Sequence, residues 1–227
     1  MDGSILRRND LRHLPKAILW DLDGTIIDST ECHFESWSEA LKSHGYSITR
    51  EIFDAHYGRN TQSVLPLYLG FEPGPELFEK INIEKEKIFR DEVVKKGSMV
   101  PGVESWMRSA NQLGIKQAIA SSSGMKNITT MLFAFRLLGY FDLLVSGANL
   151  PAKPEPDVFL EAAKLLELSP EDCLVIEDSA AGVQAAKDAG MICIAVLTSH
   201  TKSQLTAADL LVDDFRTPFA DAVAELT

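Results

Sequence analysis

The sequence has few cysteines and no long apolar segment. Three cysteines occur among 227 residues, at Cys32, Cys173 and Cys193, and no two of them form a CxxC pair. An odd number at such wide spacing argues against a disulfide framework and favours free thiols in a reducing compartment. No apolar run approaches the roughly 20 residues that a membrane-spanning helix needs. We therefore expect a cytoplasmic protein without a membrane partner.

Basic residues are also in short supply. Lys and Arg number 22 against 33 Asp and Glu, so the formal net charge is −11. Such a surface repels phosphate backbones, and nucleic acid is not expected as a partner. A small phosphorylated molecule fits better, because a metal ion and one or two cations can dominate the field locally.

The amino terminus carries no recognisable secretion signal. Arg7 and Arg8 are adjacent, but no apolar segment follows them. We expect a short polar lead-in before the first strand.

Short apolar runs alternate with helical stretches along most of the chain. The runs are residues 17–20, 117–120, 143–145, 173–176, 192–197 and 210–212. The helical stretches between most of them are residues 103–113, 125–138, 156–166 and 180–189. This alternation is typical of a parallel sheet with helices on both faces, and we expect the strand before Asp21 to be central.

One block departs from this alternation. From about residue 31 to residue 96 the pattern is helical throughout, in stretches at 34–44, 50–56, 61–69 and 75–94. The predicted fold is therefore α/β, a doubly wound parallel Rossmann-like sheet with an inserted all-helical cap domain. We assign residues 1–29 and 98–227 to the core and residues 30–97 to the cap, with hinges near 26–30 and 97–100.

The large aromatic residues predict a packed core rather than a surface for stacking ligands. We expect Cys173 and Cys193, which lie in strand-like runs, to be buried as small hydrophobic residues. The aromatic residues assigned to the core are Trp37, Phe53, Trp106, Phe133 and Phe135.

Polar side chains gather where the predicted strands end. In an open α/β sheet the ligand binds outside the carboxyl ends of the strands, so these residues are the candidates for a site. They are Asp21, Asp23 and Thr25 after the first run, Ser121 and Ser122 after the second, Lys153 a short loop after the third, and Glu177 and Asp178 after the fourth.

These residue types suit phosphoryl transfer. A carboxylate such as Asp21 can act as a nucleophile, but its charge repels a phosphate unless a divalent cation lies between them. A second carboxylate, Asp23, can donate a proton to the leaving oxygen and later take one from water. Structural roles stay open for the others: Asp178 and the serines also suit helix capping, and a lone lysine is usually solvated.

Four segments together resemble the ordered motifs of the haloacid dehalogenase (HAD) superfamily. They are DLDGTIIDS, IASSS, AKPEPDVF and VIEDSAAGVQAAKDAG, within a resemblance that runs from Lys16 to about Asp214. The closest likeness is to the branch of phosphatases and β-phosphoglucomutases, which carry a helical cap after the first motif.

The resemblance implies roles for the core residues. Asp21 is the implied nucleophile and Asp23 the general acid and base. Mg²⁺ is the implied cofactor, held by the Asp21 carboxylate, the Asp23 backbone carbonyl and Asp178, with Glu177 as a further candidate ligand. Ser121 and Lys153 are the implied phosphate binders, and Thr25 and Ser122 are added as candidates.

The cap candidates are His33, Arg59 and Lys85. The segment HFESW resembles the part of β-phosphoglucomutase in which a histidine couples cap closure to acid and base chemistry. Lys85 followed by Phe89 resembles a cap pattern of mutases and sugar phosphatases. Mutases place a phosphate-clamping arginine three residues after the glycine that corresponds to Gly58. This chain has Thr61 there, which favours a hydrolase, as does DGT in place of DGV. All three candidates also suit a solvated helix face.

The sequence thus predicts a Mg²⁺-dependent phosphatase of a small phosphomonoester, such as a sugar phosphate, acting through an aspartyl-phosphate. The partner would be a small phosphorylated metabolite, and the protein a monomer or weak homodimer. The alternative is a β-phosphoglucomutase-like hexose-phosphate mutase. A third possibility is a phosphate-sensing module like a receiver domain, although such domains are about half this length and have no inserted cap.

Overall fold

The computed structural model describes residues 14–226, so the polar lead-in expected at the amino terminus lies outside the described residues. Its main sheet has six parallel strands in the order β5-β4-β1-β6-β7-β8. The strands are β1 (Ala17–Trp20), β4 (Lys116–Ser121), β5 (Leu143–Ser146), β6 (Cys173–Glu177), β7 (Ile192–Val196) and β8 (Leu210–Val212). The strand before Asp21 is central, as predicted.

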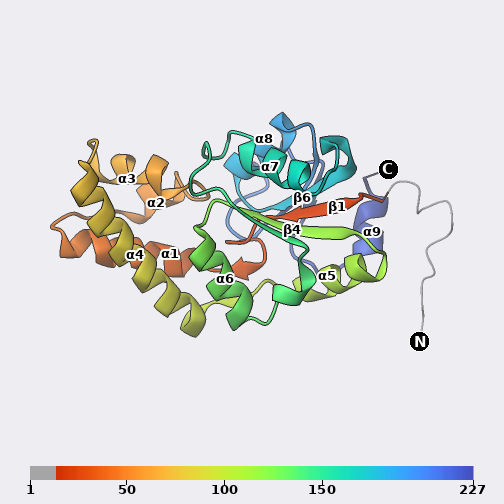
Figure 1. Cartoon of the computed structure of the whole chain (residues 1–227), viewed down its shortest axis with the longest axis horizontal. Coiled ribbons are helices and arrows are strands. Elements are labelled where there is room, and N and C mark those ends of the chain that lie inside the picture. Colours follow the sequence, from red (N-terminus) through yellow and green to blue (C-terminus); the bar gives the residue numbers. More distant parts are fainter. Residues whose placement is uncertain (1–13, 227) are drawn as a thin grey trace.

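Helices cover both faces of this sheet (Figure 1). Alternate residues of β1 point to opposite faces: Ile18 and Trp20 join one hydrophobic cluster, and Ala17 and Leu19 join the other. The first face carries α5 (Val103–Gln112), α6 (Met125–Ala134) and α9 (Phe219–Ala224), and the second carries α7 (Asp157–Leu165) and α8 (Ala180–Asp188). The predicted doubly wound α/β fold is confirmed.

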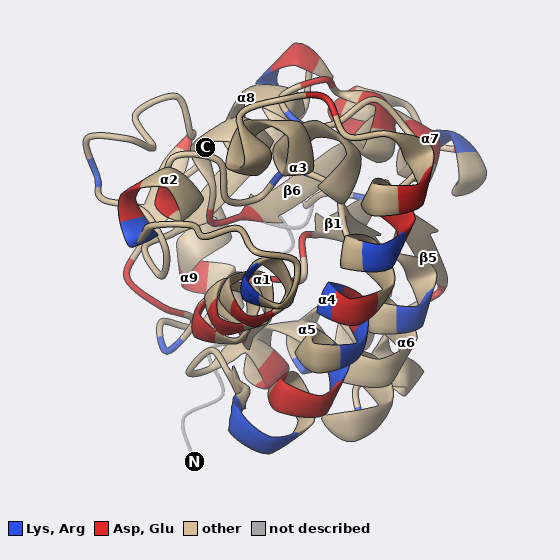
Figure 2. Cartoon of the chain, turned by 90° about the vertical axis from the view of Figure 1, so that its left-hand side faces the viewer, with Lys and Arg blue, Asp and Glu red and all other residues tan. Residues whose placement is uncertain are grey.

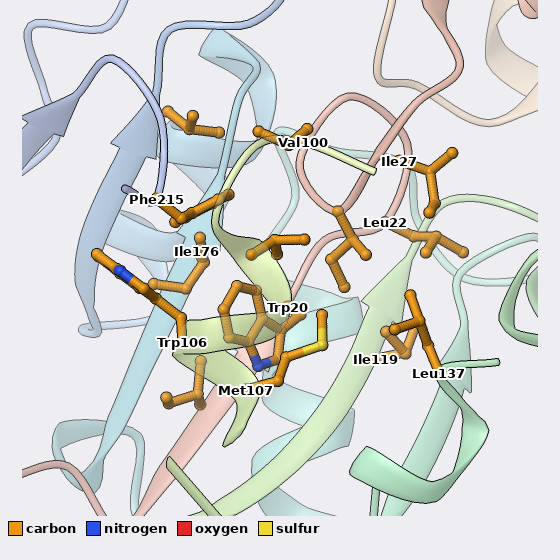
Figure 3. Packing of buried hydrophobic residues seen from close by; sticks show 14 of the residues in the cluster. Trp20, Leu22, Ile27, Val100, Trp106, Met107, Ile119, Leu137, Ile176 and Phe215 are labelled. Atoms are coloured by element: carbon orange, nitrogen blue, oxygen red, sulfur yellow. The ribbon is translucent and has the colours of Figure 1, made fainter. Parts of the chain in front are cut away.

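Aromatic packing holds the first face together (Figure 3). Trp106 is fully buried and contacts Phe215 and Phe219 edge to face, with ring centroids 4.9 and 5.3 Å apart. Its indole N–H donates to the Thr217 carbonyl at 2.7 Å, so its polar atom is also satisfied. The sheet that carries the site therefore rests on a rigid core.

Two sequence expectations near α6 were wrong. The helix predicted over residues 125–138 ends at Ala134, and Arg136 beyond it has a left-handed φ of 60°. Phe133 is 82% exposed, because it lies on the face of α6 opposite the buried Ile128 and Leu132. Of the other aromatic residues assigned to the core, Phe135 is half-buried and the remaining three are buried. Cys173 and Cys193 are buried free thiols, as expected.

Four helices lie together beside the carboxyl ends of the strands (Figure 1). They are α1 (Thr30–Ser43), α2 (Arg50–Asp54), α3 (Thr61–Leu69) and α4 (Pro75–Lys96), and they share a hydrophobic cluster of their own. Basic and acidic segments alternate along α4 (Figure 2), where Lys80 pairs with Glu76 and Lys87 with Asp91. α4 contributes to two hydrophobic clusters. Ile81 belongs to the cluster of the four helices, whereas Phe89 and Val93 belong to the cluster on the first face of the sheet.

The chain enters and leaves this helical block at one place. β2 (Ile27–Asp28) and β3 (Ser98–Met99) form a two-stranded antiparallel ladder, in which Ile27 pairs with Met99. The ladder coincides with the two segments predicted as hinges. Among the described residues no helix is long and apolar enough to cross a bilayer.

Candidate active site

Asp21 lies at the carboxyl end of the central strand, beside a buried lysine. Lys153 Nζ donates to Asp21 Oδ1 and to Glu177 Oε1, both at 2.6 Å. Burial would lower the pKa of Lys153, but the two carboxylates outweigh it and raise that pKa. Burial raises the pKa of Asp21 to about 7, because the Lys153 charge offsets only part of the desolvation and Glu177 adds repulsion. One Lys153 ammonium faces two carboxylates, so negative charge is in excess at this strand end.

Asp178 is the next acid of the cluster. Its carboxylate accepts from Thr25 Oγ1 at 3.0 Å and from the Ser199 hydroxyl. Burial raises the pKa of Asp178 well above its ordinary value, and repulsion from Glu177 and Asp21 adds to the effect. Gly24, at φ 87°, lies directly against this carboxylate, where a Cβ would collide with it. A side chain at position 24 would therefore displace Asp178.

Glu177 is fixed from both sides. While Oε1 accepts from Lys153, Oε2 accepts from the backbone N–H groups of Asp178 and Ser179, both at 2.7 Å. Ser179 Oγ also donates to Oε2 and caps α8. Both oxygens of Glu177 thus accept hydrogen bonds from protein donors.

These acids fit a divalent cation. Asp21, Glu177 and Asp178 each offer one carboxylate oxygen, and these oxygens all lie within 4.8 Å of one another. Three buried acids with one lysine among them leave negative charge uncompensated, and Mg²⁺ prefers such oxygen ligands. The Asp23 carboxylate is not part of this cluster, and the resemblance implies its backbone carbonyl as the ligand instead.

The Asp23 carboxylate is held by three side chains from different segments. Oδ1 accepts from Ser29 Oγ at 2.7 Å and lies 2.9 Å from His33 Nε2, while Oδ2 accepts from Ser123 Oγ at 2.7 Å. Burial would raise the pKa of Asp23, but His33 and the three hydrogen bonds outweigh it and lower that pKa to about 2. Asp23 is therefore held as a carboxylate in this arrangement.

The phosphate-binding candidates differ in their access to the site. Ser121 and Ser122 line the cavity at the end of β4, and Ser122 Oγ donates to the Gly58 carbonyl at 2.9 Å. Thr25 and Lys153 are buried and do not line the cavity: Thr25 donates its hydroxyl to Asp178, and Lys153 donates to Asp21 and Glu177. Both side chains therefore contact the acid cluster rather than the open cavity.

A cavity of about 250 Å³ lies between the strand ends and the helical block, and Asp21 and Asp23 line it. The three residues singled out in the helical block, His33, Arg59 and Lys85, line it as well. The His33 ring stacks on Phe89, with centroids 3.8 Å apart. The cavity is large enough for a small organic phosphate.

Comparison with known proteins agrees with this geometry. The sequence profile of the Haloacid dehalogenase-like hydrolase family matches residues 18–196. The chain belongs to this family. It is 31% identical over 207 residues to the β-phosphoglucomutase of Bacillus subtilis, covering 87% of this chain and 88% of that protein. It is 30% identical over 181 residues to the phosphorylated carbohydrates phosphatase of Thermotoga maritima, covering 78% and 82%.

Solved structures of this family share the fold. The crystal structure of β-phosphoglucomutase from Clostridium difficile matches with a TM-score of 0.85 at 24% identity, covering 94% of this chain and 97% of that one. The haloacid dehalogenase-like fold predicted from the four motifs is confirmed.

Several contacts of this haloacid dehalogenase-like site escaped prediction from the sequence. Ser29 and Ser123 hold Asp23, and Ser199 holds Asp178. Ser29 is the last residue of the first motif, and Ser123 is the third serine of the second. Both therefore lie in recognised motifs, but nothing in the sequence sets them apart from their neighbours as partners of Asp23. Glu86 and Asn127 also line the cavity, but nothing in their local sequence marks them.

Proposed function

We propose that this protein is a Mg²⁺-dependent phosphatase that hydrolyses small phosphorylated carbohydrates through a covalent intermediate on Asp21. The observation that carries the proposal is the pairing of Asp21, beside the Lys153 ammonium, with a second carboxylate on Asp23 at the same cavity. Membership of a hydrolase family supports the reaction class. The names of two relatives, a carbohydrate phosphatase and a sugar-phosphate mutase, support the substrate class.

In the first step, one Asp21 carboxylate oxygen attacks phosphorus and the bond to the leaving oxygen breaks. Asp23, in its protonated form, donates a proton to that oxygen, so that a neutral alcohol departs. In the second step, Asp23 takes a proton from water as the water attacks the aspartyl-phosphate, which releases phosphate and restores Asp21. The hydrogen-bonded carboxylate described above is the basic form that this second step needs.

The remaining core residues bind and orient the phosphate. Lys153 neutralises charge on Asp21 and on the phosphoryl group, while Ser121 and Ser122, at the end of β4, bind the phosphoryl oxygens. Asp21, the Asp23 carbonyl and Asp178 would hold Mg²⁺, with Glu177 as an additional candidate that also orients Lys153. A bound Mg²⁺ would offset repulsion between the carboxylates and the substrate phosphate.

Residues 30–97 act in this proposal as a cap domain that closes over the substrate. His33, Arg59 and Lys85 then face the part of the substrate that leaves. Closure would exclude bulk water from the cavity. A monomer or weak homodimer is part of this proposal, and sedimentation measures it.

The test is a panel of phosphorylated sugars incubated with the protein and Mg²⁺, with inorganic phosphate as the readout. We expect phosphate release from at least one member and none after chelation. β-Glucose 1-phosphate with a trace of the bisphosphate is included. Conversion to an isomeric sugar phosphate without free phosphate would replace the hydrolase by a mutase, and no turnover of any phosphate ester would point to phosphate sensing alone.

A further inference from the structure

Four side chains form a continuous polar row along one wall of the cavity. Lys85 Nζ donates to Glu86 Oε1 at 2.8 Å, and Asn127 Nδ2 donates to Glu86 Oε2. At the far end, Arg90 Nη1 donates to Asn127 Oδ1 at 2.9 Å. All four residues line the cavity, so the row is part of its surface.

Lys85 depends on this row for its charge partner. Its side chain is 4% exposed, and its ammonium lies 5.2 Å from the ring centroids of both Trp37 and Phe89. Aromatic faces attract a cation but do not replace the water it loses on burial. Apart from Asp21 and Asp23, Glu86 is the one carboxylate in the described lining of the cavity, and it supplies the ion pair.

Glu86 also joins two parts of the molecule. It lies on α4 with Lys85 and Arg90, whereas Asn127 lies on α6, which packs against α4 from the side of the sheet. Glu86 is mostly buried, with its side chain 20% exposed, and Asn127 is buried. The contact between Glu86 and Asn127 therefore exists only while α4 lies against α6.

We propose that Glu86 is a positioning residue, which fixes the Lys85 ammonium toward the substrate and does so through its contact with Asn127 across the two helices. The proposal rests on the proposed function, because it assigns Lys85 to the sugar part of a phosphorylated carbohydrate. Lys85 lies on α4 in the helical block and lines the same cavity as Asp21. The row then links correct docking of α4 on α6 to recognition of the leaving group.

This role predicts an effect that depends on the substrate. Glu86→Gln keeps the shape of the side chain but removes the charge that holds Lys85. We expect kcat/KM to fall about tenfold or more, mainly through KM, for the sugar phosphate that the panel ranks first. For p-nitrophenyl phosphate, which offers no hydroxyl groups to Lys85, kcat/KM should change less than threefold. Asn127→Ala should give the same pattern.

The control is Glu84→Gln on the same helix, where Glu84 pairs with His44 and does not line the cavity. We expect this variant to match the wild type on both substrates. A second measurement is a double-mutant cycle: in a Lys85→Met background, Glu86→Gln should have little further effect on the sugar phosphate.

Three results overturn the proposal. Additive losses in the double-mutant cycle would show that Glu86 does not act through Lys85. An equal fall on both substrates would assign Glu86 a role in folding alone. A wild-type protein that cleaves p-nitrophenyl phosphate but no sugar phosphate would overturn the proposed substrate class, and this positioning role with it.

Discussion

The Lys153 ammonium lies 2.6 Å from Asp21 Oδ1, and both side chains are buried at the end of the central strand. The contact joins residues 132 positions apart in the sequence, and it leaves the second oxygen of Asp21 outside this ion pair. One oxygen of Asp21 is thus paired with a cation and held in a fixed direction, which suits the nucleophilic role that we propose for this residue.

Replacing Asp21, the proposed nucleophile, should abolish turnover without unfolding the protein. We expect Asp21→Asn to lower kcat by about 10⁴-fold or more, because the amide cannot form the covalent intermediate. The fold should survive, since Lys153 keeps its bond to Glu177 and a buried charge is removed. Phosphate release and the thermal midpoint measure the two effects. Wild-type turnover in this variant would refute the assignment of Asp21.

Removal of the proposed Mg²⁺ should affect both activity and stability. Chelation should abolish turnover, and Mg²⁺ at 100 times its Kd should stabilise the wild type by about 2.7 kcal/mol. For a chain of this size that corresponds to roughly 5–10 °C in the thermal midpoint. Asp178→Asn should lose this shift, because it removes one of three clustered carboxylates.

The matched control for the metal is Glu161→Gln, which changes a half-buried acid paired with Lys164 outside the acid cluster. It should keep the full Mg²⁺-dependent shift. A shift of equal size in Asp178→Asn would remove Asp178 from the metal site.

Ser123 should contribute to turnover although its motif alone does not distinguish it from its neighbours. Ser123→Ala removes the hydrogen bond to Asp23 Oδ2, so the carboxylate is held by Ser29 and His33 alone. We expect kcat to fall about tenfold, the equivalent of one hydrogen bond to a charged group. Steady-state kinetics measure the loss, with Ser109→Ala, on an exposed helix face, as the control. An unchanged kcat would show that Asp23 needs no support from Ser123.

Two aromatic residues should differ sharply in their effect on stability. Trp106→Ala should lower the free energy of unfolding by about 3–5 kcal/mol, because it empties a site between Phe215 and Phe219. Phe133→Ala should change it by about 0.5 kcal/mol or less, since that ring is 82% exposed. Urea unfolding of both variants provides the comparison, and equal losses would contradict the packing described here.

Much of the fold followed from local pattern. Strands buried on both faces are short apolar runs, and Ala17–Trp20 fits that description without ambiguity. The end of α6 could not be predicted, because the apolar residues continue past Ala134 while the backbone turns at Arg136. Phe133 was misplaced for a related reason: hydrophobicity favours burial, but its position on the helix face decides the outcome.

The acids of the candidate site were predictable because each lies at or just beyond the end of a strand, and parallel strands bring their carboxyl ends to one edge. Contacts between distant segments were not. Glu86 and Asn127 are 41 residues apart on two helices, and neither lies in a motif. Only the packing of α4 on α6 brings them together, and no local periodicity encodes that pair.

The ladder in which Ile27 pairs with Met99 has a consequence for how such a protein diversifies. Because β2 and β3 are neighbours, the helical segment between them begins and ends at almost the same point. This segment can be lengthened, shortened or exchanged while all six strands of the main sheet stay in place. New substrate preferences can thus evolve in the inserted helices without rebuilding the chemistry beneath them.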